Sequence, residues 1–308
     1  MNKTPETKAA ESAKPENRAK SLPRHEAMAI ACWVTGRDRS WFAARRPEEV
    51  ASALLPGERA LIDLLSRRRL AGEPLAYLLG FREFYGRRFM VSPSVLIPRT
   101  DTECLLESAL DCLANEHRRL ATAPKRDAPN RADTGLQVLD LGTGSGCLAI
   151  SLALEAKAKG WVVEVTATDQ SAGALQVARN NAHWLGARVT FCQGDWYAAL
   201  GRAKTRFNLV VSNPPYIAAR DPHLGQGDLP FEPPSALAGC TPNADGLDDL
   251  RQIIKGATVH LREGGWLMVE HGHDQQAAVI QLMQSAGFRL VAGRPDLSGT
   301  PRLVMGQL

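Results

Sequence analysis

The spacing of apolar residues changes along the chain, and each spacing predicts a different kind of structure. Between residues 22 and 80 apolar side chains recur three and four positions apart, which predicts a small helical domain. Residues 81–91 are rich in aromatic side chains and are interrupted by Gly86, a pattern typical of a β-hairpin. Helical spacing returns at residues 102–113, so we expect residues 81–116 to form the hairpin and a connecting helix.

After residue 135, strand-like and helix-like segments alternate. Strands are expected at residues 136–140, 162–168, 188–193, 207–212 and 265–270. Helices are expected at residues 145–157, 172–185, 246–261 and 275–286. This alternation predicts a parallel sheet with helices on both faces.

The last two expected strands break the alternation. Residues 289–292 and 302–305 are separated only by a turn-rich segment, so we expect them to pair antiparallel. A mostly parallel seven-stranded sheet with a C-terminal antiparallel hairpin is the α/β arrangement of the Rossmann-like class I methyltransferase fold. We predict this fold for residues 136–308, preceded by the small helical N-terminal domain.

Two segments hold few apolar residues that could be buried. Residues 1–21 consist mainly of Lys, Glu, Ala, Pro and Asn, so we expect a disordered tail. Residues 117–135 are polar and contain Pro and Ala, which predicts a linker between the connecting helix and the α/β domain.

The composition is that of an ordinary globular protein, with 44% hydrophobic and 23% charged residues among 308. Apolar runs stay well below the roughly 18 residues that span a bilayer. The first twenty residues mix basic with acidic side chains, unlike a secretory signal or a mitochondrial presequence. Six cysteines without a CxxC pair are expected to be reduced thiols. We therefore expect a cytoplasmic protein with no membrane partner.

Charge is distributed unevenly within the net +4. Residues 1–100 hold 18 Lys and Arg against 11 Asp and Glu, whereas residues 101–308 hold 19 against 22. A partner with an acidic face or a nucleic acid would fit the basic excess, and so would a solvated helical surface. We expect the helical domain at residues 22–80 to dock a protein substrate.

A glycine-rich loop follows the first strand of the α/β domain and opens a helix. The candidate cofactor-binding residues in it are Asp140, Gly142, Thr143, Gly144, Ser145 and Gly146. Glycines let the backbone turn sharply and let a ligand approach it closely. The spacing is GxGxG, whereas dinucleotide sites use GxGxxG. The carboxylate of Asp140 would repel a pyrophosphate but attract an ammonium group, which favours S-adenosylmethionine.

Three further residues at strand ends suit the rest of that cofactor. Asp169 ends the second strand, where a carboxylate can accept from both ribose hydroxyls. Asp195 and Trp196 follow the third strand. A carboxylate there can accept from the adenine amino group, and an indole offers a face for stacking.

The motif Asn213-Pro214-Pro215-Tyr216 follows the fourth strand, at the sheet edge where open α/β sheets bind ligands. The Asn213 side-chain oxygen and the Pro214 carbonyl can accept the two hydrogens of a planar NH₂ group, while Tyr216 supplies a ring wall. An amide nitrogen is a poor nucleophile that needs positioning more than a base. We expect Asn213, Pro214 and Tyr216 to be catalytic, and all four residues of the motif to bind substrate.

Over residues 22–308 these motifs resemble the HemK/PrmC family of release-factor glutamine methyltransferases. The matching segments are FREFYG (81–86), IPRTDTE (97–103), DLGTGSG (140–146), NPPYI (213–217), FEP (231–233), DGL (245–247) and PRLVMG (301–306). The resemblance implies S-adenosylmethionine-dependent methylation, at N5, of the glutamine in the GGQ motif of peptide chain release factors. It assigns the cofactor to Gly142–Gly146, Asp169, Trp196 and Asn213. The chain departs from the usual family pattern at Thr100-Asp101, at Pro234 and at residues 240–244.

Three alternatives stay open. A glutamine methyltransferase acting on ribosomal protein L3 would usually read PRSPI where this chain has IPRTDTE, and Thr102-Glu103 disfavour it. An adenine-N6 DNA methyltransferase uses the same four-residue motif on a flipped base and needs a target-recognition domain. The residues after Tyr216 are just enough to finish the expected sheet, which disfavours this alternative. An inactive methyltransferase that serves as a binding module is disfavoured by the intact motifs. We expect no direct requirement for nucleic acid.

Two further groups of residues can be explained without a functional role. His271 and His273 follow the fifth strand without a third ligand nearby, so we expect no metal site. Arg99 and Glu103 could form a structural ion pair or could order the active site.

Overall fold

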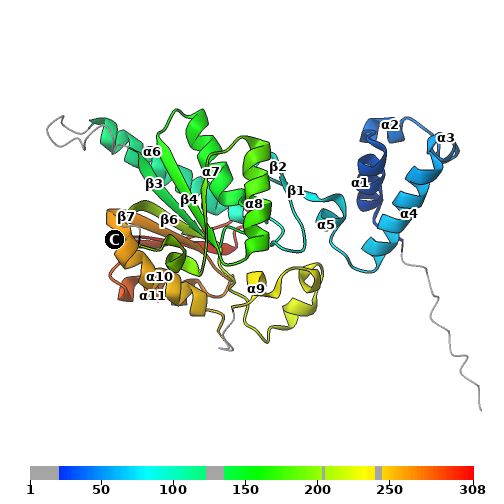
Figure 1. Cartoon of the computed structure of the whole chain (residues 1–308). Coiled ribbons are helices and arrows are strands. Elements are labelled where there is room, and N and C mark those ends of the chain that lie inside the picture. Colours follow the sequence, from blue (N-terminus) through cyan, green and yellow to red (C-terminus); the bar gives the residue numbers. More distant parts are fainter. Residues whose placement is uncertain (1–20, 123–134, 203–204, 240–244) are drawn as a thin grey trace, which may run out of the picture. The chain divides into compact units, whose positions relative to one another are not determined.

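The computed structural model describes residues 21–122, 135–202, 205–239 and 245–308. It divides into two compact units, Met1–Gly72 and Glu73–Leu308, and Figure 1 labels most of their helices and strands. Apart from Ser21, the tail predicted over residues 1–21 lies outside the described residues.

The first unit is helical, as the apolar spacing predicted. Its helices are α1 (Arg24–Thr35), α2 (Arg39–Ala43), α3 (Pro47–Ala53) and α4 (Pro56–Leu70). Both α3 and α4 begin with proline, which is tolerated there because the first helical N–H groups have no intrahelical partner. Helix α1 packs against α4, and Ile30 and Leu65 are buried. Glu26 accepts hydrogen bonds from Nε and Nη2 of Arg69 at 2.9 Å each, which ties the two helices together.

The second compact unit begins at Glu73. Helix α5 (Leu75–Leu79) was assigned to the helical domain at residues 22–80, but it belongs to the compact unit that starts at Glu73. Leu78 of α5 is buried, but the helical spacing of apolar residues does not show which core a buried side chain joins.

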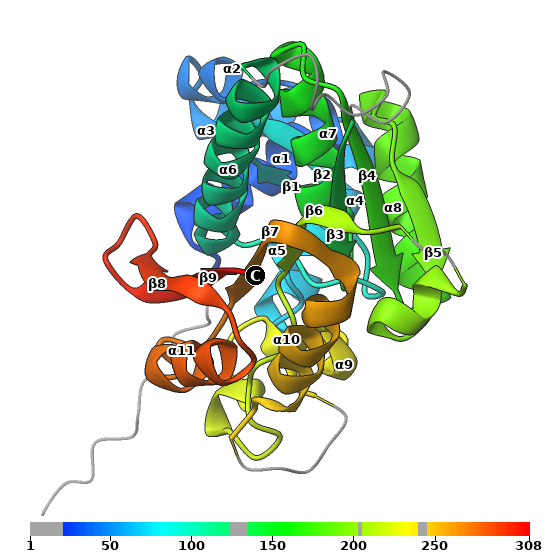
Figure 2. The ribbon, with the colours of Figure 1, turned by 90° about the vertical axis from the view of Figure 1, so that its left-hand side faces the viewer.

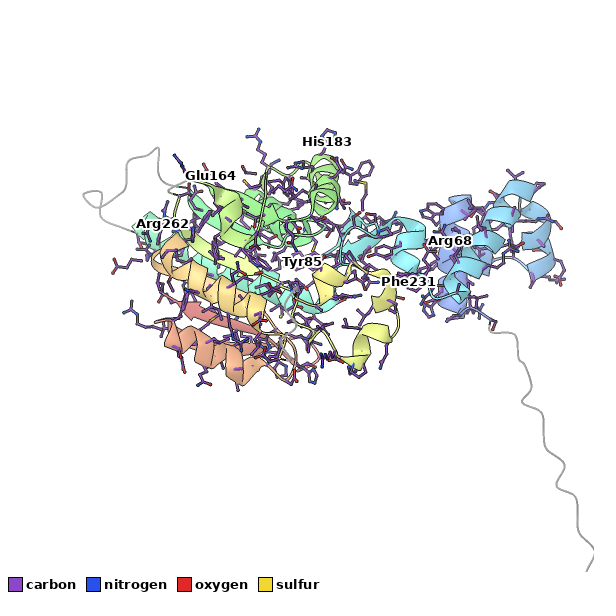
Figure 3. The ribbon with its side chains drawn as sticks, turned by 60° about the horizontal axis from the view of Figure 1, so that its bottom comes forward. Arg68, Tyr85, Glu164, His183, Phe231 and Arg262 are labelled. Carbon is purple, nitrogen blue, oxygen red and sulfur yellow. The ribbon has the colours of Figure 1, made fainter. Side chains whose placement is uncertain are left out.

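The predicted hairpin is confirmed. Strands β1 (Phe81–Phe84) and β2 (Arg87–Met90) pair antiparallel. Tyr85 and Gly86 form the two-residue turn with φ of 48° and 70°, a geometry that matches the twist of the paired strands. The turn residue Tyr85 is labelled in Figure 3.

The α/β domain contains the predicted seven-stranded sheet, in the order β5-β4-β3-β6-β7-β9-β8. Its strands are β3 (Leu136–Leu141), β4 (Val163–Asp169), β5 (Thr190–Gln193), β6 (Phe207–Ser212), β7 (Leu261–Glu270), β8 (Arg289–Pro295) and β9 (Pro301–Gln307). The first five run parallel, whereas β9 pairs antiparallel with both β7 and β8. The predicted class I methyltransferase fold is therefore confirmed.

Helices cover both faces of the sheet (Figure 2). One face packs against α6 (Glu103–Thr122), α7 (Cys147–Ala158) and α8 (Ala172–Leu185), and the other against α10 (Asp248–His260) and α11 (Gln276–Ser285). The strands alternate between the two cores, so that Val138 joins the first and Leu139 the second. Phe84 and Phe89 of the hairpin lie in the first core, so the hairpin is part of the α/β domain.

The linker predicted from residue 117 begins later than expected, because α6 continues to Thr122. Leu106, Leu113 and Leu120 are spaced seven residues apart, and Leu120 packs against the core that buries the other two. His117 stacks on Trp161 with ring centroids 5.9 Å apart. The remainder of the predicted linker, residues 123–134, lies outside the described residues.

None of the helices in the described ranges is long and apolar enough to cross a membrane. The five cysteines in those ranges are free thiols, and Cys240 lies outside them.

Candidate functional site

Most of the residues singled out in the sequence surround one cavity of about 340 Å³. It lies where β3, β4, β5 and β6 end. The sequence-predicted residues that line it are Asp140, Gly142, Thr143, Gly144, Ser145, Asp169, Asp195, Trp196, Asn213 and Pro215. In Figure 3, Glu164 near the start of β4 and Phe231 in the segment after β6 mark opposite ends of the sheet.

Gly146 does not line this cavity. A side chain there would meet the Ile150 side chain at 2.8 Å and the Ala178 Cβ at 3.1 Å. The missing side chain at Gly146 therefore allows close packing of α7 against α8.

The glycine loop lies across the end of β3. The N–H groups of Gly142 and Thr143 each donate to the Thr168 carbonyl at 2.9 Å, which anchors the loop to β4. Gly142 has a φ of 70°, and a Cβ on it would meet the Trp196 ring at 3.1 Å. Glycine at 142 thus permits both the turn and the approach of the indole.

Asp140 brings a buried carboxylate to the cavity wall. The Thr143 hydroxyl donates to its Oδ2 at 2.6 Å, and only 1% of the residue is exposed. Burial raises the pKa of Asp140 to about 7, and the nearby Asp169 carboxylate adds to the effect. A cationic group in the cavity would favour the ionised form.

Asp169 accepts one backbone hydrogen bond at each of its oxygens and holds the glycine loop through Oδ2. Oδ2 accepts from the Gly144 N–H and Oδ1 accepts from the Ser171 N–H, each at 2.9 Å. Burial raises the pKa of this carboxyl. A carboxylate oxygen has more than one lone-pair site, so each oxygen can still accept from a ligand hydroxyl.

Asp195 and Trp196 face residues of α10 that the sequence analysis missed. Gln252 Nε2 donates to Asp195 Oδ2 at 3.3 Å, and the Trp196 side chain lies near Asp249 and lowers the pKa of that carboxyl, which burial raises. Asp249 and Gln252 also line the cavity. They lie more than fifty residues from Trp196 in an amphipathic helix, where no local pattern distinguishes them from a solvated face.

A smaller cavity of about 90 Å³ adjoins the Asn213-Pro214-Pro215-Tyr216 turn after β6. Asn213, Pro214 and Tyr216 line it, and Asn213 lines the larger cavity as well. The four-residue motif is therefore divided: Pro215 faces the large cavity, Pro214 and Tyr216 the small one, and Asn213 both.

Thr102 and Glu270 bind the side chains of this motif. Asn213 Nδ2 donates to Thr102 Oγ1 at 3.0 Å, and the Tyr216 hydroxyl donates to Glu270 Oε1 at 3.2 Å. Burial raises the pKa of Glu270 to about 7, while the hydrogen bonds from Thr102 and Tyr216 oppose the rise. Glu270 has no role predicted from the sequence, although a carboxylate at the end of an apolar strand is a signal that could have identified it.

Arg99 and Glu103 do not pair with each other as was considered from the sequence. Arg99 forms an ion pair with Glu232, and Glu103 Oε1 accepts from the Tyr85 N–H at 2.9 Å. Asp101, one of the departures from the family pattern, has its Oδ2 3.2 Å from Arg302 Nε. Glu103 therefore supports the hairpin turn, whereas Arg99 lines both cavities.

The histidines after β7 show no metal arrangement. Nδ1 of the buried His271 lies 2.7 Å from the Gly272 carbonyl oxygen. Throughout the described residues, no three His, Cys, Asp or Glu side chains are grouped as metal ligands would be.

Comparison with known proteins gives matches to both parts of the chain. A family model described as a methyltransferase domain matches residues 132–292, and one described as the PrmC N-terminal domain matches residues 13–80, which is where the sequence analysis ended the helical domain. The release factor glutamine methyltransferase of Bordetella pertussis (strain Tohama I) is 48% identical over 93% of this chain and 96% of its own length. That of Neisseria gonorrhoeae (strain FA 1090) is 43% identical over 93% and 94%.

A solved structure also matches, the release factor-specific protein-(glutamine-N5) methyltransferase of Alicyclobacillus acidocaldarius. It is 29% identical, covers 71% of this chain and 98% of its own, and superposes with a TM-score of 0.39.

Proposed function

The chain belongs to the family of release factor glutamine methyltransferases, and on this premise we propose that it methylates N5 of the glutamine in the GGQ motif of peptide chain release factors. S-adenosylmethionine is the methyl donor. The main observation that supports the proposal is that Asn213 lines two adjoining cavities. One residue thereby faces a site large enough for a cofactor and a narrow site suited to one side chain.

The large cavity offers a matching group for each part of S-adenosylmethionine. Asp140 supplies a buried carboxylate for the ammonium group, and Asp169 supplies two acceptors for the ribose hydroxyls. Trp196 gives the adenine an aromatic surface, with Asp195 as acceptor for the amino group. When bound, the cofactor supplies a methyl group activated by a positively charged sulfur.

Asn213, Pro214 and Tyr216 position the nucleophile. The Asn213 side-chain oxygen and the Pro214 carbonyl accept the two hydrogens of the substrate NH₂, and the Tyr216 ring limits its rotation. Orienting a poor nucleophile in line with the transferred group contributes roughly 7–11 kcal/mol when the geometry is ideal. A general base is not required, because the amide nitrogen loses its proton only after it has gained the methyl group.

The protein substrate docks on the N-terminal helical domain, predicted at residues 22–80. The basic excess of residues 1–100 supports this assignment, because it suits an acidic face on a partner. Release factors act in translation, so we place the enzyme in the cytoplasm, without a need for nucleic acid or membrane.

Incubation of the protein with labelled S-adenosylmethionine and a release factor tests the proposal. We expect the label on the GGQ peptide after proteolysis and mass spectrometry, and no label when the substrate glutamine is replaced. Ribosomal protein L3 and adenine-containing DNA serve as competing substrates in parallel reactions. Preferential labelling of either one would contradict the proposal, as would cofactor binding without transfer to any of the three.

A further inference from the structure

Three hydrogen bonds connect the motif after β6 to one buried carboxylate. Asn213 Nδ2 donates to Thr102 Oγ1 at 3.0 Å. The Thr102 hydroxyl donates to Glu270 Oε2 at 2.8 Å, and the Tyr216 hydroxyl donates to Glu270 Oε1 at 3.2 Å. Thr102 and Glu270 are 3% and 1% exposed, so water has little access to this network.

The carboxylate determines the direction of every bond in the network. An ionised carboxylate can only accept, and a threonine hydroxyl has one proton to donate. Because Thr102 donates its proton to Glu270, its oxygen can only accept from Asn213. Asn213 must therefore turn its NH₂ group toward Thr102, which leaves its Oδ1 for the opposite side of the amide.

The orientation of the Asn213 amide decides what the neighbouring cavity can hold. With Oδ1 toward the substrate, both Asn213 and the Pro214 carbonyl present acceptors, and they match the two hydrogens of a primary amide. A carboxylate has no hydrogen to donate, so the same two acceptors would repel it. With NH₂ toward the substrate, this preference would be lost.

We infer that Glu270 is a positioning residue that, through Thr102, fixes the acceptor side of Asn213 toward the substrate and makes the site selective for glutamine over glutamate. The inference rests on the proposed function, because it concerns recognition of the substrate amide. Neither Glu270 nor Thr102 contacts the transferred methyl group in this account. Thr102 acts on the reaction by holding Asn213, and Glu270 acts by holding Thr102 and the Tyr216 hydroxyl.

Replacing Thr102 separates hydrogen bonding from packing. Thr102→Val keeps the branched shape but removes the hydroxyl, whereas Thr102→Ser keeps the hydroxyl. With a release factor as substrate at pH 8, above the Glu270 pKa of about 7, we expect Val to lower kcat at least about tenfold and Ser by less than about threefold. Melting temperature and cofactor Kd are measured alongside. Equal kcat values for folded Val and Ser variants would overturn the inference.

Selectivity provides a readout that a merely structural defect would not move. A release factor whose GGQ glutamine is replaced by glutamate is used as a competitive inhibitor, and its Ki is compared with the KM of the glutamine form. We expect a large ratio of Ki to KM in the wild type and in Thr102→Ser. In Thr102→Val we expect this ratio to be smaller by about tenfold. A ratio unchanged in Thr102→Val would contradict the role of the network in selectivity.

A double-mutant cycle tests whether Glu270 acts through Thr102. Glu270→Leu removes the acceptor of both Thr102 and Tyr216, so we expect a loss in kcat at least as large as that of Thr102→Val. The double variant should lose no more than Glu270→Leu alone. Independent, multiplicative losses would overturn the inference. If Glu270→Leu does not fold, the comparison of Thr102→Val with Thr102→Ser is the deciding test of the inference. An inactive wild type would refute the proposed function itself, whereas an active wild type with insensitive variants would refute only this inference.

Discussion

Arg99 and Glu232 lie 133 residues apart in the sequence and form an ion pair in which the carboxylate is completely buried. The second oxygen of Glu232 accepts from the Ile97 N–H at 2.9 Å. One carboxylate thereby joins the segment after the hairpin to the segment after β6. Both segments contribute residues to the cavity walls, so this pair holds two sides of the site together.

The stability of an Arg99→Ala variant should depend on pH. Burial raises the pKa of Glu232, and Arg99 opposes the rise, so removing Arg99 raises that pKa further. An acid whose folded-state pKa is raised destabilises the fold as pH rises above its unfolded value of about 4.3. We expect a small difference in unfolding free energy from the wild type near pH 4.5, growing to about 3 kcal/mol at pH 8. Denaturant unfolding at several pH values measures it.

The double variant Arg99→Ala, Glu232→Gln is the matched control for that experiment. It removes the buried charge together with its partner, so most of the loss in unfolding free energy at pH 8 should disappear. A deficit that is independent of pH, or that persists in the double variant, would show that Arg99 contributes through packing alone.

Cofactor affinity should rise with pH between 6 and 8. The buried carboxyl of Asp140 has a pKa of about 7, and only its ionised form attracts the cofactor ammonium group. At pH 6 most of the free protein carries the neutral form, which should weaken binding by about tenfold relative to pH 8. Calorimetric titration at several pH values measures the cofactor affinity. The control variant Asp140→Asn should bind the cofactor weakly, with an affinity that does not change between pH 6 and 8. A flat wild-type profile would remove Asp140 from the ammonium site.

Asn213→Ala should impair methyl transfer far more than cofactor binding. It removes one acceptor for the substrate NH₂, which should cost about 2–4 kcal/mol in the transition state, or roughly 10²- to 10³-fold in rate. Single-turnover rates on a GGQ-containing release factor measure the loss. Asn180→Ala, an exposed position on α8, should leave the rate unchanged. Wild-type rates in folded Asn213→Ala would rule out positioning by this side chain.

A chain that begins at Glu73 should separate docking from chemistry. It keeps the complete α/β unit, including the hairpin whose Phe84 and Phe89 are buried in its core. We expect normal cofactor affinity and normal activity on a short GGQ peptide. The kcat/KM for whole release factor should fall at least about tenfold, which corresponds to about 1.4 kcal/mol of docking free energy. Full activity on the whole factor would contradict a docking role for the first unit.

Local patterns predicted most of the fold. The alternation of strand and helix periods after residue 135 gave the sheet and its layers, and the glycine loop and the motif at Asn213 were recognisable because their residues are neighbours in sequence. The end of α6 was misjudged because Leu120 is a single apolar residue among polar ones, and only its packing shows that the helix continues. The unit with which α5 packs could not be predicted, because helical period says nothing about which core a helix joins.

The connections within the site were beyond local reasoning. Thr102 and Asn213 are 111 residues apart, and their hydrogen bond depends on how the whole sheet brings β6 next to the segment before α6. Asp249 lines the same cavity as Trp196 from an amphipathic helix whose sequence is typical of a solvated surface. Sequence patterns identify residues that carry a motif, whereas the residues that orient them become visible only in three dimensions.

The contact between Gly142 and the Trp196 ring constrains the two positions unequally in evolution. Gly142 has a positive φ, so a residue with a side chain is strained there whatever stands at position 196, and a Cβ would also press on the Trp196 ring. A smaller ring at position 196 would introduce no such strain and would only widen the cavity. Among diverging descendants of this chain, position 142 should therefore stay glycine while position 196 varies. The residue at position 196 would then set the width of the cavity at its nucleoside end.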